Sequence, residues 1–392
     1  MGPLALMAKQ AGNDVFGSDL AAGAILPELE AAGIEVEIGA QDGAFLREKI
    51  AEGVDWFVYT SALPDDHAEL VLARESGIRV SKRDEFTAYL VKELGLKMIA
   101  VSGTHGKTTT TAMIIWASLK LGLPVSYIVG TTLGFAPSGA YHPGDKYFVY
   151  EADEYDRNFL HYNPWLAILP SVTYDHPDIY PTREDYTAAF SQFKSQSENV
   201  IEGDEVVAED FALAGEVRRK DATLASMAVK RMLEDLGQDD AADLKRILGE
   251  FPGVGRRFEK LKDGLYSDYA HHPEEIAATI EVAREEAELR GKKGVVVIYE
   301  PHQNKRQHEV REGYPEAFRG ADKVYWLPTY LVRDNGDLPI LSAEELSQGI
   351  ENAEVAEMSD ALAEKIRAEL DEGMLVILMT AGPADEWVRK KI

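Results

Sequence analysis

A glycine-rich segment with one lysine and a run of threonines lies at residues 102–110 and reads Ser-Gly-Thr-His-Gly-Lys-Thr-Thr-Thr. Gly103 and Gly106 allow the backbone to approach an anion closely, so that successive N–H groups at a helix N-terminus can surround a phosphate. Lys107 would place a positive charge on the outer phosphates. Thr108 would offer its hydroxyl to a magnesium ion. The chemistry indicated is the binding of a nucleoside triphosphate.

The flanking residues support this interpretation. Residues 97–101 predict a buried parallel strand, and the apolar spacing over 108–121 predicts an amphipathic helix. The spacing departs from the standard phosphate-loop pattern, because Val101 stands where the first glycine would be. The alternative is a glycine-rich turn between strand and helix that binds nothing.

Two further side chains with metal-binding chemistry follow apolar runs. Glu151 comes directly after 147–150, and His176 follows 167–169. In open parallel sheets, ligands bind beyond the carboxyl ends of the strands, which is where both residues are expected. The alternatives are an exposed acidic turn for Glu151 and a hydrogen-bonded histidine outside the metal shell for His176. Zinc hydrolysis fits poorly, because no second histidine or cysteine cluster accompanies His176.

Composition limits the possible functions. The chain has 392 residues, 45% of them apolar, which is enough for two or three domains with cores of their own. No cysteine is present, which excludes disulfides, thiol catalysis and cysteine-ligated metals. No apolar run reaches membrane-spanning length, and no signal peptide is indicated, so we expect a cytoplasmic enzyme without membrane insertion.

The net charge of −27 argues against nucleic-acid binding, which needs a basic face. An anionic substrate must therefore be met by local cations. The candidates are Lys107, the pair Arg256–Arg257 and the pair Lys305–Arg306. The alternative for the two pairs is a solvated surface position.

Alternating strand and helix patterns indicate an α/β protein with three domains. Residues 1–95 predict strands at 35–38 and 56–59, and residues 96–252 contain the phosphate loop and a sheet expected to be parallel. Residues 253–392 predict a second doubly wound unit.

The phosphate-loop segment resembles the signature of the Mur ligases, the ATP-dependent amide-bond-forming enzymes of peptidoglycan synthesis. The resemblance covers nearly the whole chain, because further family motifs follow in the same order. They are Gly-Ser-Asp at 17–19, Thr-Ser-Ala-Leu-Pro at 60–64, Glu-Ala-Asp-Glu-Tyr-Asp at 151–156, Asp-His-Pro-Asp at 175–178, Gly-Arg-Arg-Phe at 255–258, Asp-Tyr-Ala-His-His-Pro at 268–273 and Glu-Pro-His at 300–302.

The resemblance implies a role for each domain. Residues 1–95 would be a truncated Rossmann-like domain that binds a UDP-sugar, and its first strand and glycine loop are expected to be missing, since the chain begins after them. Residues 96–252 would be the ATP-binding central domain, shorter than in relatives. Residues 253–392 would be a Rossmann-like domain that binds the amino acid and closes over the nucleotide.

The resemblance also assigns the site residues. Thr108, Glu151 and His176 would hold Mg²⁺. Lys107, His176, His271 and Arg306 would be catalytic, with Arg306 meeting the amino-acid carboxylate because Gln303 carries no charge. Either His271 or His272 would contact phosphate or the amino-acid site. The ATP-binding residues would be Gly103, Thr104, His105, Gly106, Lys107, Thr108, Thr109, Arg257 and Asp268.

Within the family, the chain looks most similar to members that join L-alanine to UDP-N-acetylmuramate through an acyl phosphate. We expect a monomer or homodimer with these small-molecule substrates. Three alternatives stay open: a ligase that adds a preformed tripeptide to the same sugar nucleotide, a folate- or cyanophycin-type ligase, and a nucleotide-binding protein without catalysis. Residues 215–222 and Ser171 depart from the family pattern, so adenine recognition is expected to differ in detail.

Overall fold

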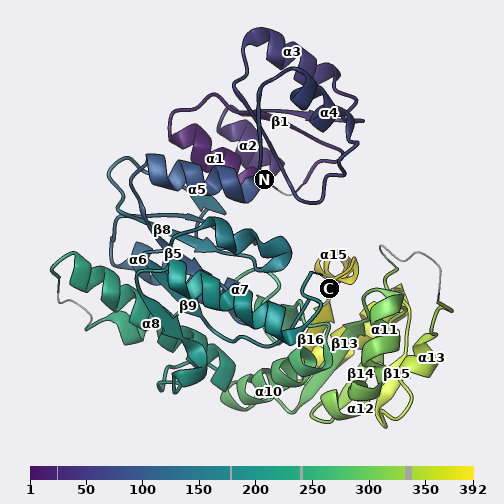
Figure 1. The fold of residues 1–392 in the computed structure, drawn as a ribbon. Coiled ribbons are helices and arrows are strands. Elements are labelled where there is room, and N and C mark those ends of the chain that lie inside the picture. The colour runs from purple at the N-terminus through teal and green to yellow at the C-terminus, as the bar shows by residue number, and fades with distance from the viewer. Residues whose placement is uncertain (24, 177–178, 239–241, 332–337) are drawn as a thin grey trace. The chain divides into compact units, whose positions relative to one another are not determined.

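The computed structural model describes residues 1–23, 25–176, 179–238, 242–331 and 338–392. These residues form two compact units, one of 1–209 with 220–251 and one of 210–219 with 252–392. Figure 1 colours the chain from purple at the N-terminus to yellow at the C-terminus. Among the helices of the described ranges, none combines the length and the apolar composition needed to span a membrane.

Short parallel strands alternate with helices at the start of the first unit. They form two separate two-stranded parallel sheets, β1 with β2 and β3 with β4. In these four strands only Ser81 is buried, whereas helices normally cover both faces of parallel strands. The elements are α1 (Gly2–Gln10), β1 (Phe16–Asp19), α2 (Leu26–Ala31), β2 (Glu35–Ile38), α3 (Ala44–Glu52), β3 (Trp56–Tyr59), α4 (Ala68–Glu75), β4 (Arg79–Lys82) and α5 (Arg83–Glu93).

Helix α1 packs on the central sheet of the first unit. Leu4 and Met7 lie in the same apolar cluster as Phe148 of β8. The backbone N–H of Tyr141 donates to the Gln10 side chain at 2.7 Å. A Cβ at Gly139 would lie 2.5 Å from the Pro3 carbonyl oxygen, so this close approach requires a glycine.

The central sheet has six strands in the order β10-β9-β5-β8-β6-β7. Its elements are β5 (Lys97–Val101), α6 (Lys107–Lys120), β6 (Val125–Ile128), β7 (Gly139–Ala140), β8 (Tyr147–Glu151), η1 (Tyr155–His161), β9 (Leu166–Leu169), α7 (Arg183–Gln196), β10 (Val200–Glu202), η2 (Gly203–Glu205), α8 (Glu216–Asp235) and α9 (Leu244–Gly249). The expected strand and helix around the phosphate loop are therefore present, each within one residue of its predicted bounds.

Side chains of β8 alternate between the two faces of this sheet. Phe148 joins the cluster that holds Phe159 and residues of α5 and α7. On the opposite face, the Tyr147 hydroxyl donates to Asp235 of α8 at 2.7 Å. Helices thus cover both faces of the central sheet (Figure 1).

The second unit contains another six-stranded sheet, in the order β11-β12-β16-β13-β14-β15. One face packs on α10 and α12 and the other on α14 and α15, which makes the unit doubly wound. Its elements are β11 (Glu259–Lys262), β12 (Leu265–Asp268), α10 (Pro273–Leu289), β13 (Val295–Glu300), α11 (Asn304–Val310), η3 (Arg311–Gly313), α12 (Tyr314–Ala317), β14 (Lys323–Trp326), α13 (Ala343–Leu346), β15 (Ala353–Val355), α14 (Asp360–Asp371), β16 (Leu375–Thr380) and α15 (Ala384–Lys391).

The expectation of a parallel central sheet needs one correction. β7 pairs antiparallel with β6, because only residues 129–138 connect them and these include no crossover helix. In the second unit, β11 is likewise antiparallel to β12. Asp263 and Gly264 form the tight turn between them, with Gly264 at φ 77°.

Candidate active site

The loop between β5 and α6 is shaped by two glycines. Gly103 has φ 134°, and a Cβ there would lie 2.4 Å from the carbonyl oxygen of Ser171. Gly106 has φ 82°, and a Cβ there would lie 2.7 Å from Asp221 Oδ1. Both positions therefore exclude larger residues on steric and conformational grounds.

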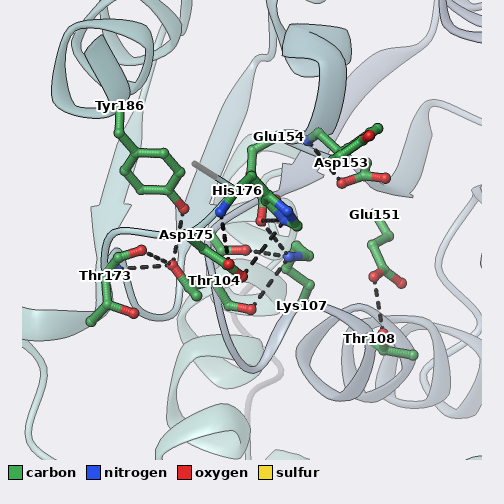
Figure 2. A network of polar contacts seen from close by, with 12 residues as sticks. Thr104, Lys107, Thr108, Glu151, Asp153, Glu154, Thr173, Asp175, His176 and Tyr186 are labelled. Carbon is green, nitrogen blue, oxygen red and sulfur yellow. Dashed lines mark hydrogen bonds and ion pairs between the residues drawn. The ribbon is translucent and has the colours of Figure 1, made fainter. Parts of the chain in front are cut away.

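Hydrogen bonds of Thr104 connect the loop to the segment after β9. Its backbone N–H donates to the Ser171 carbonyl at 2.7 Å, and its hydroxyl donates to the Thr173 carbonyl at 2.5 Å. The Thr173 N–H returns a hydrogen bond to the Thr104 hydroxyl at 2.9 Å, and Tyr186 lies 3.0 Å away (Figure 2). His105 and Thr109 are half-buried in the same loop and first helical turn.

Lys107, the first residue of α6, points at Glu154. Its ammonium group lies 2.9 Å from Glu154 Oε1 and also donates to the Gly103 carbonyl (Figure 2). The Glu154 side chain is 1% exposed, and its Oε2 atom has no hydrogen-bond partner among the described residues. A buried carboxylate thus balances the charge of the phosphate-loop lysine.

His176 lies on the other side of the same carboxylate. Its Nε2 atom is 3.7 Å from Glu154 Oε1 and 3.6 Å from Asp175. The residue has φ 57°, an uncommon left-handed backbone conformation for a residue other than glycine, and its ring meets Tyr155 edge-on at 5.1 Å. Pro177 and Asp178, which complete the sequence motif, lie outside the described residues.

The titration behaviour of this group follows from burial and charge. Burial alone would raise the pKa of Glu154, but His176 and the Lys107 ammonium outweigh it and hold that pKa below its usual value. Burial would lower the pKa of His176, but Glu154 and Asp175 raise it overall. Burial and the neighbouring Glu154 charge raise the pKa of Asp153. Glu154 and His176 therefore both favour their ionised forms.

Thr108 and Glu151 form a second pair one residue along α6. The Thr108 hydroxyl donates to Glu151 Oε1 at 3.0 Å. The pair is set by the sheet, because Glu151 ends β8 and pairs with Val101, the last residue of β5. A hydroxyl and a carboxylate are hard oxygen donors suited to Mg²⁺.

The donor chemistry of Thr108 and Glu151 thus fits magnesium, provided that phosphate and water oxygens supply the remaining ligands. No group of three or more histidine, cysteine or acidic side chains in a metal-holding arrangement occurs among the described residues. In the structure His176 contacts Glu154 rather than Glu151, so its role as a metal ligand stays a prediction.

In the second unit, the Asp268 side chain accepts hydrogen bonds from backbone N–H groups of nearby loops. The residue ends β12, is 7% exposed, and accepts backbone hydrogen bonds from Phe258 at 2.6 Å and Ala270 at 2.8 Å. Burial raises its pKa, and nearby Arg257 opposes that effect. The nucleoside contact implied for Asp268 stays a prediction.

His271 and Arg306 lie in one cluster of the second unit. The His271 ring is 6.0 Å from His302, and Arg306 Nη1 is 3.2 Å from His302 Nδ1. His271 Nδ1 lies 2.9 Å from the Tyr269 carbonyl, and burial lowers the pKa of His271. The unit therefore places an imidazole that favours its neutral form and a guanidinium on either side of His302.

Both arginines of the pair at 256–257 stack on one aromatic ring. Their guanidinium carbons lie 4.8 and 5.3 Å from the centroid of Tyr269, and Arg256 also donates to the Thr380 carbonyl. They are built into the unit rather than placed as solvated surface residues.

The sequence did not predict the partners of the expected residues. Glu154 appears in the sequence only as part of the acidic motif at 151–156, and its pairing with Lys107 carries no spacing signal. Asp221, which restricts Gly106, accepts from Thr110 at 3.1 Å and stands more than a hundred positions from the loop. Contacts of this kind appear only when the sheet has been assembled.

Three family models match this chain in succession. They are the Mur ligase family catalytic domain over residues 1–94, the Mur ligase middle domain over 101–231 and the Mur ligase glutamate ligase domain over 256–382. The three-domain α/β organisation expected from the sequence is thereby confirmed.

Relatives of known name cover most of the chain. A UDP-N-acetylmuramate–L-alanine ligase of Symbiobacterium thermophilum is 32% identical over 454 aligned residues, spanning 99% of this chain and 90% of the relative. The ligase of the same name from Mycolicibacterium gilvum is 32% identical over 430, spanning 95% and 89%.

Solved structures share the fold. The UDP-N-acetylmuramate-alanine ligase of Thermotoga maritima superposes with a TM-score of 0.78 at 24% identity, covering 100% of this chain and 95% of that one. A murein peptide ligase of Psychrobacter arcticus gives a TM-score of 0.62 at 21% identity, with the same coverage of 100% and 95%.

Proposed function

The chain belongs to the Mur ligase family and is an ATP-dependent amide ligase, and from that premise we propose that it joins L-alanine to the carboxyl group of UDP-N-acetylmuramate. Support for this choice of substrates comes from the curated relatives, which are named for this reaction and are 32% identical over nearly the whole chain.

The observation that carries the proposal is the juxtaposition of Lys107 and the Thr108–Glu151 pair at the carboxyl edge of the central sheet. In the proposed reaction, the substrate carboxylate attacks the γ-phosphorus of ATP, the bond to the β-γ bridging oxygen breaks, and ADP leaves. Two anions must meet in this step, so positive charge must accumulate around them.

The chain's own groups have separable tasks in this scheme. The loop backbone at Gly103 and Gly106 surrounds phosphate oxygens, and Lys107 neutralises charge on the transferred group. Thr108 and Glu151 would hold Mg²⁺, which when bound neutralises phosphate charge and orients its oxygens. Glu154 keeps Lys107 extended toward the loop before substrates arrive.

The second step is amide formation. The uncharged amine of L-alanine attacks the acyl carbon of the acyl phosphate, and inorganic phosphate leaves with the electrons of the broken carbon–oxygen bond. The proton lost by the amine nitrogen leaves on the released phosphate. Arg306 and His271 are the proposed contacts of the amino-acid carboxylate, because the second unit holds them in one cluster.

Phosphate release by the purified protein tests the proposal. We expect release to require ATP, Mg²⁺, UDP-N-acetylmuramate and L-alanine together, with a product whose mass equals that of the amide. Phosphate release at an equal rate without the sugar nucleotide or the amino acid would refute the ligase assignment.

The choice of acceptor is tested in the same assay. Replacing L-alanine with the tripeptide L-alanyl-γ-D-glutamyl-meso-diaminopimelate should lower kcat/KM at least tenfold. A higher kcat/KM for the tripeptide would instead assign the chain to the peptide-adding members of the family.

A further inference from the structure

Arg83 is held by a network of hydrogen bonds that includes a buried carboxylate, and the proposed reaction assigns it no role. It is the first residue of α5, and its side chain is 33% exposed. Its guanidinium contacts the neighbouring Asp84, with Nε 3.2 Å from Oδ2 and Nη2 3.3 Å from Oδ1.

Asp84 is itself fully buried and held by two tyrosines. The hydroxyl of Tyr150 donates to its Oδ1 atom at 2.9 Å, and the hydroxyl of Tyr162 does so at 2.8 Å. Burial raises the pKa of both tyrosines, so each stays a neutral hydroxyl donor. The Asp84 carboxylate, held by the two tyrosines, thus fixes the position of the Arg83 guanidinium.

The fixed arginine keeps donors to spare. A guanidinium has five N–H groups, and Asp84 occupies the side formed by Nε and one N–H of Nη2. Among the described residues, no partner takes the N–H groups of Nη1. The end-on face formed by Nη1 and Nη2 is the geometry that binds a carboxylate or phosphate through two hydrogen bonds.

The support also ties Arg83 to the segment that carries the candidate catalytic groups. Tyr150 directly precedes Glu151, and Tyr162 follows η1, so Asp84 holds both ends of residues 151–161. The neighbouring Lys82 reaches Asp156 at 2.6 Å. Burial and the Glu154 charge raise the pKa of Asp153, and the nearby Arg83 charge is one of the smaller effects that oppose this rise.

An anionic substrate that approaches this segment meets carboxylates at Glu151, Asp153 and Glu154, and these repel it. Lys107 is already paired with Glu154 and lies in the loop expected to bind the triphosphate. A second cation with unoccupied donors near this segment would offset the repulsion, and Arg83 has such donors and is joined to the segment through Asp84.

We propose that Arg83 binds an oxyanion of the sugar-nucleotide substrate through its end-on face, and that Asp84, Tyr150 and Tyr162 position it. This inference rests on the proposed function, since it names the residue that recognises the acid substrate of that reaction. The oxyanion is either the carboxylate of the muramyl group or a phosphate of the diphosphate, which share the same hydrogen-bonding chemistry.

Arg83→Lys and Arg83→Gln test the assignment in the full-length protein. Both should raise KM for UDP-N-acetylmuramate roughly tenfold or more, as expected for loss of a charge-assisted pair of hydrogen bonds, while KM for ATP stays within twofold. The matched control is Arg74→Lys, on the exposed face of α4, which should leave both KM values unchanged.

Binding of two probes to Arg83→Lys identifies the oxyanion. Weaker binding of UDP-N-acetylmuramate with unchanged binding of UDP points to the carboxylate, and weaker binding of both points to the diphosphate. Wild-type affinity for both probes in the variant overturns the inference. If the wild-type protein itself binds no UDP-N-acetylmuramate, the proposed function fails and the inference falls with it.

Tyr162→Phe separates positioning from stability, and it covers the case in which Arg83→Gln does not fold. Loss of one hydroxyl that fixes Asp84 should raise KM for the sugar nucleotide with kcat nearly unchanged. A lowered melting temperature with an unchanged KM would show that the network only stabilises the fold, which would also overturn the inference.

Discussion

At the scale of single residues, the phosphate-loop lysine Lys107 forms an ion pair with Glu154. Glu154 is buried, so its pairing with Lys107 compensates part of the cost of removing a carboxylate from water. Binding of a triphosphate must therefore exchange or share an existing partner of Lys107. Lys107 therefore adds less to the affinity for a triphosphate than an unpaired lysine would, but its side chain is already oriented.

Glu151→Gln tests the predicted magnesium pair. The amide keeps the size of the side chain and the hydrogen bond from Thr108 but removes the charge that attracts a divalent cation. We expect the Mg²⁺ concentration for half-maximal activity to rise roughly tenfold, measured by phosphate release at fixed ATP. Glu202→Gln, in the half-buried pair with Lys194, is the control and should not change the Mg²⁺ dependence.

Residue types were predictable from the sequence where a motif lies at a strand end. Lys107, Thr108 and Glu151 follow from the loop and from the apolar runs before it. The Lys107–Glu154 pair was not predictable, because the turn after Glu154 depends on Asp156 and Arg157 in left-handed conformations that propensities do not suggest. The support of Arg83 joins residues about seventy positions apart, which no local pattern encodes.

At the scale of elements, the loop between β5 and α6 combines positive φ angles with close neighbours. Gly106 is the N-cap of α6, and Asp221 of α8 lies where its side chain would be. Helix α8 thus limits the size of the side chain that the N-cap position of α6 can hold.

Gly106→Ala should separate these two effects when compared with Gly122→Ala. Both glycines have positive φ, 82° and 67°, so backbone strain should cost each variant about 1–2 kcal/mol of unfolding free energy, and the close neighbours of Gly106 should add to the cost of Gly106→Ala. Only Gly106→Ala also meets a neighbour within 4 Å, and only it should abolish ATP binding, measured by calorimetry. Equal ATP affinity in the two variants would show that the loop does not bind the phosphates.

Helix α8 is anchored at its other end by charge. Asp235 accepts from Lys97 of β5 at 2.5 Å and from Tyr147 of β8 at 2.7 Å. The hydrogen bonds from Lys97 and then Tyr147 lower the pKa of Asp235. The contact joins α8 to two neighbouring strands of the central sheet.

Asp235→Asn should therefore have a pH-dependent effect. Because the folded-state pKa lies below 3.8, the stabilisation is present above that unfolded-state value and disappears as the pH falls through the folded-state pKa. We expect a loss of about 1 kcal/mol at pH 7, modest because the pair is partly exposed, and a smaller loss at pH 2.5. Urea titrations at the two pH values measure it, and a loss of equal size at both would contradict the assignment.

At the scale of the whole molecule, the two large sheets and the two small ones differ in how far their strands are buried from solvent. β13 and β16 are buried along their full length, whereas β1 to β4 are mostly half-exposed in two-stranded sheets. Isolated two-stranded sheets are marginal in water. The fold class was predictable from alternating strands and helices, but the division of residues 1–93 into two sheets was not, because strand pairing is a non-local property.

Hydrogen exchange should reveal this difference directly. Backbone amides in peptides covering β1 to β4 should exchange at least tenfold faster than those of β13 and β16, because the local opening free energy falls with fewer buried contacts. Mass spectrometry of pepsin fragments measures the rates. Similar protection in both groups would show that the N-terminal sheets are as stable as the large ones.

Helix α1 limits how this protein can be recombined with its relatives. Leu4 and Met7 fill the core behind Phe148, although they come from the residues that match the first family model. A chimera that exchanges everything before β5 would replace part of the hydrophobic interior of the ATP-binding module with a foreign helix. The transferable unit for grafting is therefore the central module together with its own first ten residues, even though about eighty-five residues separate the two in sequence.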